Sequence, residues 1–139
     1  MKTEPVAPDP ELTETLVRMA GSEDPAERVS ALSQLAVERP VESGIVREIL
    51  QTALSDEDPN VRGQAVYAVV RRGGVEAAAV LQDALQDSAL PVRLMAVDSL
   101  GTDEESIALL KQALADSEEA VRELVAMKLE SLSATHGIQ

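Results

Sequence analysis

Arginine recurs in this chain as part of a longer pattern that is repeated four times. The four copies carry Arg28, Arg62, Arg93 and Arg122, which are 34, 31 and 29 residues apart. A leucine lies twelve residues before each arginine, and small or aliphatic residues lie three, four and seven residues after it. Repetition at periods of about 20 to 50 residues is typical of proteins that stack one supersecondary unit. One unit cannot bury its apolar side chains alone, so the copies must pack on one another.

Each copy predicts two helices joined by a short polar turn. In the second copy, apolar residues recur at helical spacing over 46–53 and again over 61–69. Helical spacing on both sides of a turn indicates a helical hairpin. We therefore expect an all-α fold of four antiparallel helix pairs. The predicted helices span 9–20, 25–37, 43–54, 59–72, 75–86, 90–100, 103–115 and 118–133.

Capping residues and glycines divide the chain at the same places. Asp24-Pro25 and Asp58-Pro59 each put a capping carboxylate before a proline at the first helical position. Thr102 and Glu105 have the spacing of a capping box at the start of the helix over 103–115. Glycine ends helices because it adopts the left-handed backbone conformation at low steric cost. We expect such ends at Gly21, Gly73, Gly74 and Gly101.

The repeats predict a single domain over residues 9–133, flanked by two short segments. Residues 1–8 are predicted to be a flexible Pro-rich linker, because the start MKTEPVAPDP has three prolines and lacks the apolar core of a signal peptide. The segment could also be the stub left after a signal or anchor is removed. Residues 134–139 are predicted to be a disordered tail. The repeats span about 9–38, 43–72, 75–100 and 103–133.

Composition excludes several classes of function. The chain has no cysteine, so disulfide frameworks, thiolate zinc sites and cysteine nucleophiles are excluded. Its net charge of -13 repels phosphate backbones, so nucleic acid is not an expected partner. No run of 18 apolar residues exists, so no membrane insertion is expected. We expect a cytoplasmic protein, with an exported or membrane-tethered domain as the alternative.

Catalytic, cofactor and metal sites are not expected. His136 is the only histidine and lies past the last predicted helix, which argues against a Ser-His-Asp triad or a histidine zinc site. The acidic runs at 56–58, 103–105 and 118–119 lack the ligand spacing and glycine of a calcium loop. Acidic residues near helix starts are favoured by the helix dipole. The sequence therefore predicts a protein that is not an enzyme.

Three stretches show the repeat most clearly: ALSDEDPNVRGQAVYAV over 53–69, ALQDSALPVRLMAVDSL over 84–100 and ALADSEEAVRELVAMKL over 113–129. A looser copy, MAGSEDPAERVSALSQL, covers 19–35. These stretches resemble HEAT repeats, specifically the short HEAT-like class also seen in phycobilisome lyases. The resemblance covers about residues 9 to 133. It implies a right-handed α-solenoid, the superhelix of armadillo and HEAT proteins.

In HEAT repeats, an aspartate and an arginine of each turn typically form a ladder of charge-assisted hydrogen bonds between neighbouring repeats. The first copy departs from this pattern, because Ser22 stands at the aspartate position and Glu27 replaces the valine before the arginine. We therefore expect a weaker or more solvated first interface. Carried over by position, the resemblance implies a structural ladder of Asp56, Asp87 and Asp116 with Arg28, Arg62, Arg93 and Arg122.

The resemblance also implies that the second helix of each pair lines a concave face. Positions two and five after each arginine are expected to point outward there, and they become more apolar from the first repeat (Ser30, Ser33) to the last. An apolar strip on such a face suits docking of a peptide or helix. Alternatively, these side chains pack against a neighbouring repeat or the tail. The candidate protein-binding residues are Gln64, Tyr67, Arg71, Met95, Asp98, Leu124 and Met127.

Two functions remain in contention. The first is a non-catalytic protein–protein interaction module or scaffold that uses this face to bind a partner with a basic or amphipathic segment. The second is a lyase-related accessory protein that holds a chromophore or its acceptor protein, as the resemblance implies. The last predicted helix is apolar on several sides over 121–132. Either the tail folds back over it, or a homodimer forms through the C-terminal repeat.

Overall fold

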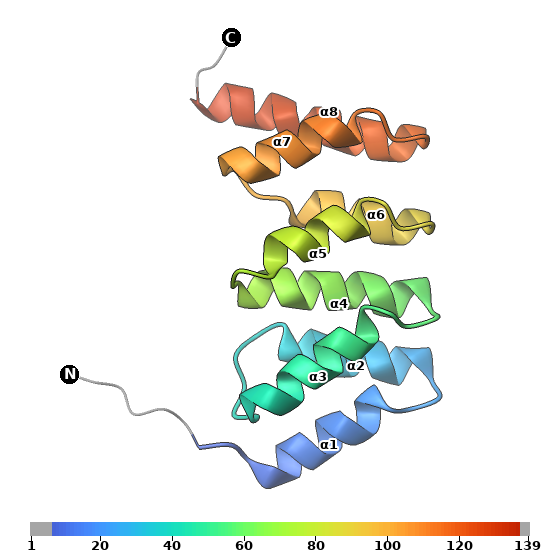
Figure 1. Ribbon diagram of the computed structural model, residues 1–139, viewed down its shortest axis with the longest axis vertical. Helices are drawn as coiled ribbons and strands as arrows, with labels where there is room; N and C mark the ends of the chain where they lie inside the picture. The colour runs from blue at the N-terminus through green and yellow to red at the C-terminus, as the bar shows by residue number, and fades with distance from the viewer. Residues whose placement is uncertain (1–6, 137–139) are drawn as a thin grey trace, which may run out of the picture. The chain divides into compact units, whose positions relative to one another are not determined.

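The computed structural model describes residues 7–136, which form eight helices and no strand (Figure 1). The prediction of an all-α fold is confirmed, and every predicted helix is present. Most helix starts and ends agree with the predicted ones to within two residues. The helices are α1 (Pro10–Ala20), α2 (Pro25–Leu35), α3 (Ser43–Ala53), α4 (Pro59–Arg72), α5 (Ala77–Ala84), α6 (Leu90–Ser99), α7 (Glu104–Ala113) and α8 (Glu119–His136).

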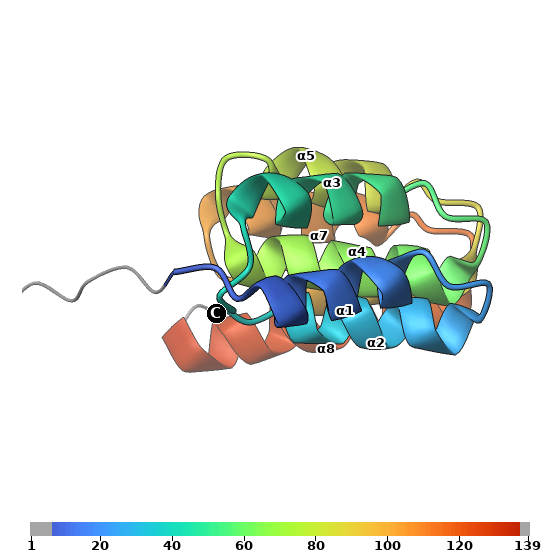
Figure 2. The same cartoon turned by 90° about the horizontal axis from the view of Figure 1, so that it is seen from below.

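The chain divides between Arg72 and Gly73 into two compact units. In the first unit, α1 pairs with α2 and α3 pairs with α4; the two pairs then stack, α1 on α3 and α2 on α4. The second unit repeats this scheme with α5 to α8. Within each unit, the turns inside the two helix pairs lie at the same end of the helices (Figure 2). The turn residues of the two repeats in each unit are therefore neighbours.

The buried positions follow the repeat pattern. The residue three positions after each turn arginine is fully buried in all four copies: Ala31, Ala65, Ala96 and Val125 are each 0% exposed. The leucine twelve positions before the arginine is buried in every copy as well. Full burial of one leucine or valine side chain stabilises a fold by about 1.5–3 kcal/mol. The repeated pattern is therefore the pattern of the core.

Two predicted helix caps are confirmed and one is wrong. The carboxylates of Asp24 and Asp58 accept the backbone N–H groups two residues onward, at 3.0 and 2.8 Å. At α7, however, the cap is Asp103 rather than Thr102. Asp103 accepts the Ser106 N–H at 3.1 Å and the Ser106 hydroxyl at 2.6 Å. The ionised carboxylate is the stronger acceptor, and it starts the helix one residue later than the Thr102–Glu105 spacing predicts.

Glycine ends a helix in the left-handed conformation at only one of the predicted places. Gly73 and Gly74 have φ values of 76° and 109°, where a side chain is strained. Gly21 follows α1 with φ at −95°, and its N–H donates to the Val17 carbonyl at 3.1 Å. Gly101 is not in the left-handed region either. The helices end beside these two glycines as predicted, but the left-handed conformation given as the reason is not used there.

The chain ends of the structure differ from the predicted boundaries. Helix α8 continues to His136, beyond the predicted end at 133, because no glycine or proline interrupts it before Gly137. The predicted tail is thus helical over 134–136, and residues 137–139 lie outside the described part. Of the predicted linker, only residues 7 and 8 are described. The single repeat domain over 9–133 stays a prediction.

Candidate functional site

The turn arginines join successive repeats inside each unit. The Arg28 guanidinium donates from Nε and Nη2 to the two carboxylate oxygens of Asp56, at 2.9 and 3.0 Å. Arg93 makes the same pair of bonds to Asp116, at 3.0 and 3.4 Å. All four side chains are between 9% and 13% exposed. Such a two-point, charge-assisted contact fixes the register between repeats.

The remaining guanidinium nitrogen, Nη1, binds the arginine's own turn in all four repeats. It donates to a backbone carbonyl six residues earlier, which fixes the orientation of the guanidinium. In Arg28 and Arg93 this leaves Nε and Nη2 directed at the aspartate of the next repeat. This combination needs the rigid fork of donors that arginine has and lysine lacks. The acceptors are Ser22 O at 2.8 Å, Asp56 O at 2.8 Å, Asp87 O at 2.9 Å and Asp116 O at 2.7 Å.

The charge balance at Asp56 favours the ionised carboxylate. Burial raises the pKa of Asp56, but the hydrogen bonds from Arg28 and the Asp58 N–H, with the charges of Arg28 and Arg62, outweigh it. The net effect is a lowered pKa. In turn, the hydrogen bond to Asp56 raises the pKa of Arg28. The pair is thus ionised on both sides.

The expected weakness of the first interface is not seen. The ladder runs from the arginine of one repeat to the aspartate of the next, so Arg28 uses Asp56 and does not depend on position 22. Ser22 accepts the Asp24 N–H at 3.1 Å and keeps the turn in shape. An aspartate at position 22 would make a ladder contact only with a repeat that preceded the first.

Basic side chains also join the repeats at the opposite ends of the second helices. In the first unit, Arg72 donates to the Leu35 carbonyl at 3.0 Å. In the second unit, the Lys128 ammonium donates to the carbonyls of Val97, Asp98 and Leu100 at 2.9, 2.9 and 2.7 Å. Burial lowers the pKa of Lys128, against the charge of Asp98, which raises it. These contacts satisfy carbonyl groups that a helix end leaves open.

Sequence reasoning missed this second set of contacts. Arg72 lies ten residues after its turn arginine, and Lys128 lies six residues after its own. The two basic residues therefore share no position in the repeat. The acceptors do, because Leu35 and Leu100 both lie seven residues after the turn arginine. Lysine and arginine side chains are long enough to reach these carbonyls from either position. The basic residue therefore does not recur at one place in the repeat, and the sequence pattern does not reveal it.

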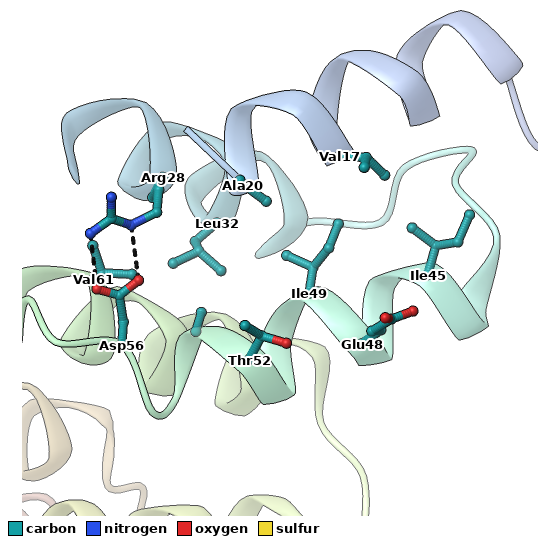
Figure 3. A pocket seen from close by; sticks show the side chains of 12 residues that line it. Val17, Ala20, Arg28, Leu32, Ile45, Glu48, Ile49, Thr52, Asp56 and Val61 are labelled. Carbon is teal, nitrogen blue, oxygen red and sulfur yellow. Dashed lines mark hydrogen bonds and ion pairs between the residues drawn. The ribbon is translucent and has the colours of Figure 1, made fainter. Parts of the chain in front are cut away.

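A hollow of about 490 Å³ lies between α1 and α3 in the first unit (Figure 3). Val17 from α1 and Ile45 and Ile49 from α3 point into it. Val17 is 47% exposed, and both isoleucines are half-buried. The deeper lining includes the fully buried Leu32 and Val61. We call this hollow the α1–α3 groove.

The polar groups of the α1–α3 groove are few and mostly engaged with each other. The Arg28–Asp56 pair lies at one end, with its hydrogen bonds made internally (Figure 3). Glu48 and Thr52 are exposed residues of α3 that complete the lining. Catalytic and cofactor pockets instead have polar groups that converge on a ligand. The groove is therefore a surface for apolar side chains.

Sequence reasoning did not single out the α1–α3 groove, although a signal for it exists. On helix 43–54, Val46 and Leu50 are buried between the helices, while Ile45 and Ile49 add a second apolar stripe beside them. A helix that only packs on one core face needs a single stripe. The apolar face of this helix is wider than core packing requires, which indicates a second surface for contact with another group.

A second hollow, of about 420 Å³, lies at the turns of the second unit. Its lining is largely polar and includes the Arg93–Asp116 pair together with Gln86, Asp87 and Gln112. Asp87 accepts the Ala89 N–H there at 2.9 Å. This hollow follows the ladder and belongs to the joint between the two repeats.

The predicted protein-binding residues lie on the second helices of three repeats. In the first unit, Gln64 and Tyr67 on α4 are half-buried and Arg71 is exposed. In the second unit, α6 packs on α8, and both helices carry candidates. Whether they form one binding surface stays a prediction. In that unit Met95 and Leu124 are half-buried, Asp98 is exposed and Met127 is 66% exposed.

Within residues 7–136, no group of three or more histidine, cysteine, aspartate or glutamate side chains could hold a metal ion. None of the helices in that part of the chain has the length and hydropathy needed to cross a membrane. His136 lies in the last turn of α8. The prediction that it lies past the last helix is therefore wrong.

Comparison with known protein families gives a match to HEAT repeats over residues 10–101. This match covers more than half of the chain. The chain belongs to the HEAT-repeat family. Proteins of this family commonly mediate protein–protein interactions and are generally non-catalytic scaffolds. The comparison with curated proteins gave no match.

The fourth helix pair lies outside the matched residues but has the same construction. Its helices α7 and α8 pair with each other and stack on α5 and α6. Its aspartate, Asp116, accepts hydrogen bonds from Arg93 of the third repeat, just as Asp56 accepts hydrogen bonds from Arg28. The structure therefore extends the repeat assignment from the sequence beyond residue 101.

Proposed function

We propose that this HEAT-repeat protein is a non-catalytic protein–protein interaction module that binds an amphipathic helix in the α1–α3 groove. The observation that carries the proposal is the groove itself, an apolar hollow of about 490 Å³ at the surface of the first unit. An amphipathic helix that lays its apolar face into such a groove is a common recognition mode. Family members commonly have protein partners, which agrees with this proposal.

Charge complementarity favours a partner helix with a basic polar face. The chain carries a net charge of -13. Near the α1–α3 groove, Glu48 is exposed on α3, and Glu14 is exposed one turn before Val17 on α1. Lysine or arginine on the partner would face these carboxylates while its apolar residues fill the groove. Opposite charge also raises the rate of encounter at low ionic strength.

The residues predicted on the second helices are proposed as further contacts for a protein partner. Met127 supports this best, since a long, adaptable apolar side chain is 66% exposed on α8. Tyr67 is the corresponding candidate on α4. Replacing either one by aspartate is expected to weaken partner binding. The full proposed set is Gln64, Tyr67, Arg71, Met95, Asp98, Leu124 and Met127.

Two further predictions on partners stay proposals. A homodimer through the C-terminal repeat would elute as a dimer at high concentration, whereas a monomer elutes as 14.8 kDa. An accessory protein that holds a chromophore would need polar groups that converge on the ligand. In the α1–α3 groove the Arg28–Asp56 pair is already engaged, which favours an apolar helix over such a ligand.

The experiment is selection from a displayed library of helical peptides on the purified full chain, followed by affinity measurement on matched variants. Val17→Asp places a charge inside the α1–α3 groove. Val37→Asp is the control, because Val37 is also 47% exposed but lies outside the groove lining. Selected peptides are expected to be amphipathic and basic, to lose about tenfold or more in affinity for Val17→Asp and to keep their affinity for Val37→Asp.

Two outcomes would contradict the proposal. The selected peptides could lack an amphipathic pattern, or Val17→Asp and Val37→Asp could change their affinity equally. Circular dichroism of both variants confirms that each retains its helices. Repeating the measurement with Ile49→Asp probes the opposite wall of the α1–α3 groove and is expected to agree with Val17→Asp.

A further inference from the structure

The first and fourth repeats differ in the polarity of their outer faces. We call the side of a repeat that meets the following repeat its forward face, and the side that meets the preceding repeat its backward face. In the first and third repeats, the forward face contains the turn arginine and the residues four and seven positions after it. These apolar residues are buried: Leu32 and Leu35 are each 0% exposed, Val97 is 0% and Leu100 is 4% exposed.

The forward face of the fourth repeat keeps its apolar residues although no further repeat is described beyond it. Ala126 is exposed and Leu129 is half-buried at the two positions that are buried in the third repeat. Leu114 is 43% exposed, whereas Leu85, at the same position of the third repeat, is 7% exposed. The terminal repeats of stacked proteins normally carry a polar outer face. Within residues 7–136, no further repeat covers these apolar side chains.

Arg122 gives the same forward face a specific recognition element. Its Nη1 donates to the Asp116 carbonyl at 2.7 Å, so its guanidinium is oriented like those of Arg28 and Arg93. In those two arginines, Nε and Nη2 hold the aspartate of the next repeat. Among the residues that the structure describes, none accepts a hydrogen bond from Nε or Nη2 of Arg122. A pre-oriented guanidinium fork selects a carboxylate.

The backward face of the first repeat has the opposite character. Ser22 replaces the aspartate that would offer a carboxylate, and its hydroxyl accepts the Asp24 N–H instead. Glu27 is exposed where the other repeats have a valine buried to 1% exposure or less. A second copy of this chain thus cannot fill the forward face of the fourth repeat in the way that repeats fill one another. Head-to-tail stacking of copies, which would form open filaments, is opposed.

We propose that the forward face of the fourth repeat, formed by Leu114, Arg122, Ala126 and Leu129, binds a helical hairpin of another protein. The turn of that hairpin carries an aspartate, and an aliphatic residue follows five positions later. The spacing is that of Asp56 with Val61, Asp87 with Val92 and Asp116 with Val121 in this chain.

The internal examples show what the partner's aspartate does. Asp56 and Asp116 each accept a backbone N–H two residues onward at 2.9 Å, which holds the carboxylate in place for the arginine fork. The following valines, Val61 and Val121, are 0% exposed. A hairpin with both features satisfies Arg122 and covers the exposed apolar residues together. This recognition is independent of the α1–α3 groove, which lies in the first unit.

The test uses the protein's own chain as the probe. A donor copy carries Ser22→Asp and Glu27→Val, which create the missing backward face, and Arg122→Gln, which prevents it from stacking on itself. Sedimentation velocity of this donor mixed with the wild-type chain is expected to show a one-to-one complex. Binding is expected to fall about tenfold or more for an acceptor with Arg122→Gln. Arg47→Gln, at an exposed arginine on α3, and Val37→Asp, at an exposed valine outside both surfaces, are acceptor controls expected to leave binding unchanged.

Four results would overturn the proposal, provided that circular dichroism shows folded variants. The donor could fail to bind the wild-type chain. It could bind the Arg122→Gln acceptor as well as the wild type. The wild-type chain could by itself form a dimer that Arg122→Gln weakens, which would assign the face to a second copy. Deletion of residues 137–139 could be required for binding, which would assign the face to the chain's own end.

Discussion

Replacing Arg28 by methionine tests how much one ladder contact stabilises the repeats. Methionine keeps much of the apolar stem but removes both donors to Asp56 and those to the carbonyls of Ser22 and Glu23. Breaking one side of a buried ion pair destabilises a protein by about 3–5 kcal/mol, whereas exposed pairs contribute about 0–1 kcal/mol. Both side chains are partly buried, at 13% exposed, so the effect should lie between these two ranges.

We therefore expect Arg28→Met to lower the free energy of unfolding by about 2 kcal/mol, compared with the 5–15 kcal/mol that is usual for one domain. Urea unfolding followed by far-ultraviolet circular dichroism measures the change. Arg47→Met is the matched control, because Arg47 is an exposed arginine of the same unit, and it should change stability by less than about 0.5 kcal/mol.

The pH dependence of this difference is a second check. The pKa of Asp56 is lowered in the folded protein, so its contribution is present above its ordinary value of 3.8 and is lost as the pH falls through the lower folded value. In Arg28→Met the main cause of that lowering is gone. The stability difference between wild type and variant should therefore shrink in acid below about pH 3.8. A loss of stability no larger than that of Arg47→Met, or a difference that does not change with pH, would refute the reasoning.

Two further predictions concern helix ends. Lys128→Met should lower the free energy of unfolding by about 2 kcal/mol, because three carbonyls at the end of α6 lose their charged donor. Lys111→Met, at an exposed site, should change the free energy of unfolding little. Thermal unfolding of both variants checks this, and equal effects would contradict it. Gly74→Ala should destabilise the protein by about 1 kcal/mol because φ of Gly74 is 109°. Gly21→Ala should be neutral or slightly stabilising, because φ of Gly21 is −95° and the new Cβ would be in ordinary contact, 3.5 Å from the Val17 carbonyl oxygen. Destabilisation of similar size in both glycine variants would show that left-handed backbone is not the cause.

Part of the site could be predicted from the sequence and part could not. The ladder positions could be predicted because the arginine recurs in all four turns and the aspartate in three, and a recurring position has the same neighbours in each repeat. Lys128 and Arg72 do not recur at one position, so no pattern marked them. The α1–α3 groove depends on how far α1 lies from α3, and spacing along the chain does not determine that distance.

By itself, the sequence determined the helical hairpins, the apolar positions that form the core and the polar finish of the first repeat at Ser22 and Glu27. Each of these depends on local periodicity or on chemistry repeated at a fixed spacing. Tertiary structure decided the direction of the ladder, from Arg28 to Asp56 and from Arg93 to Asp116. It also decided which apolar residues stay uncovered, at Val17 in the groove and at Leu114 on the last repeat. Exposure depends on what packs against a residue, and only the arrangement of the helices in space supplies that.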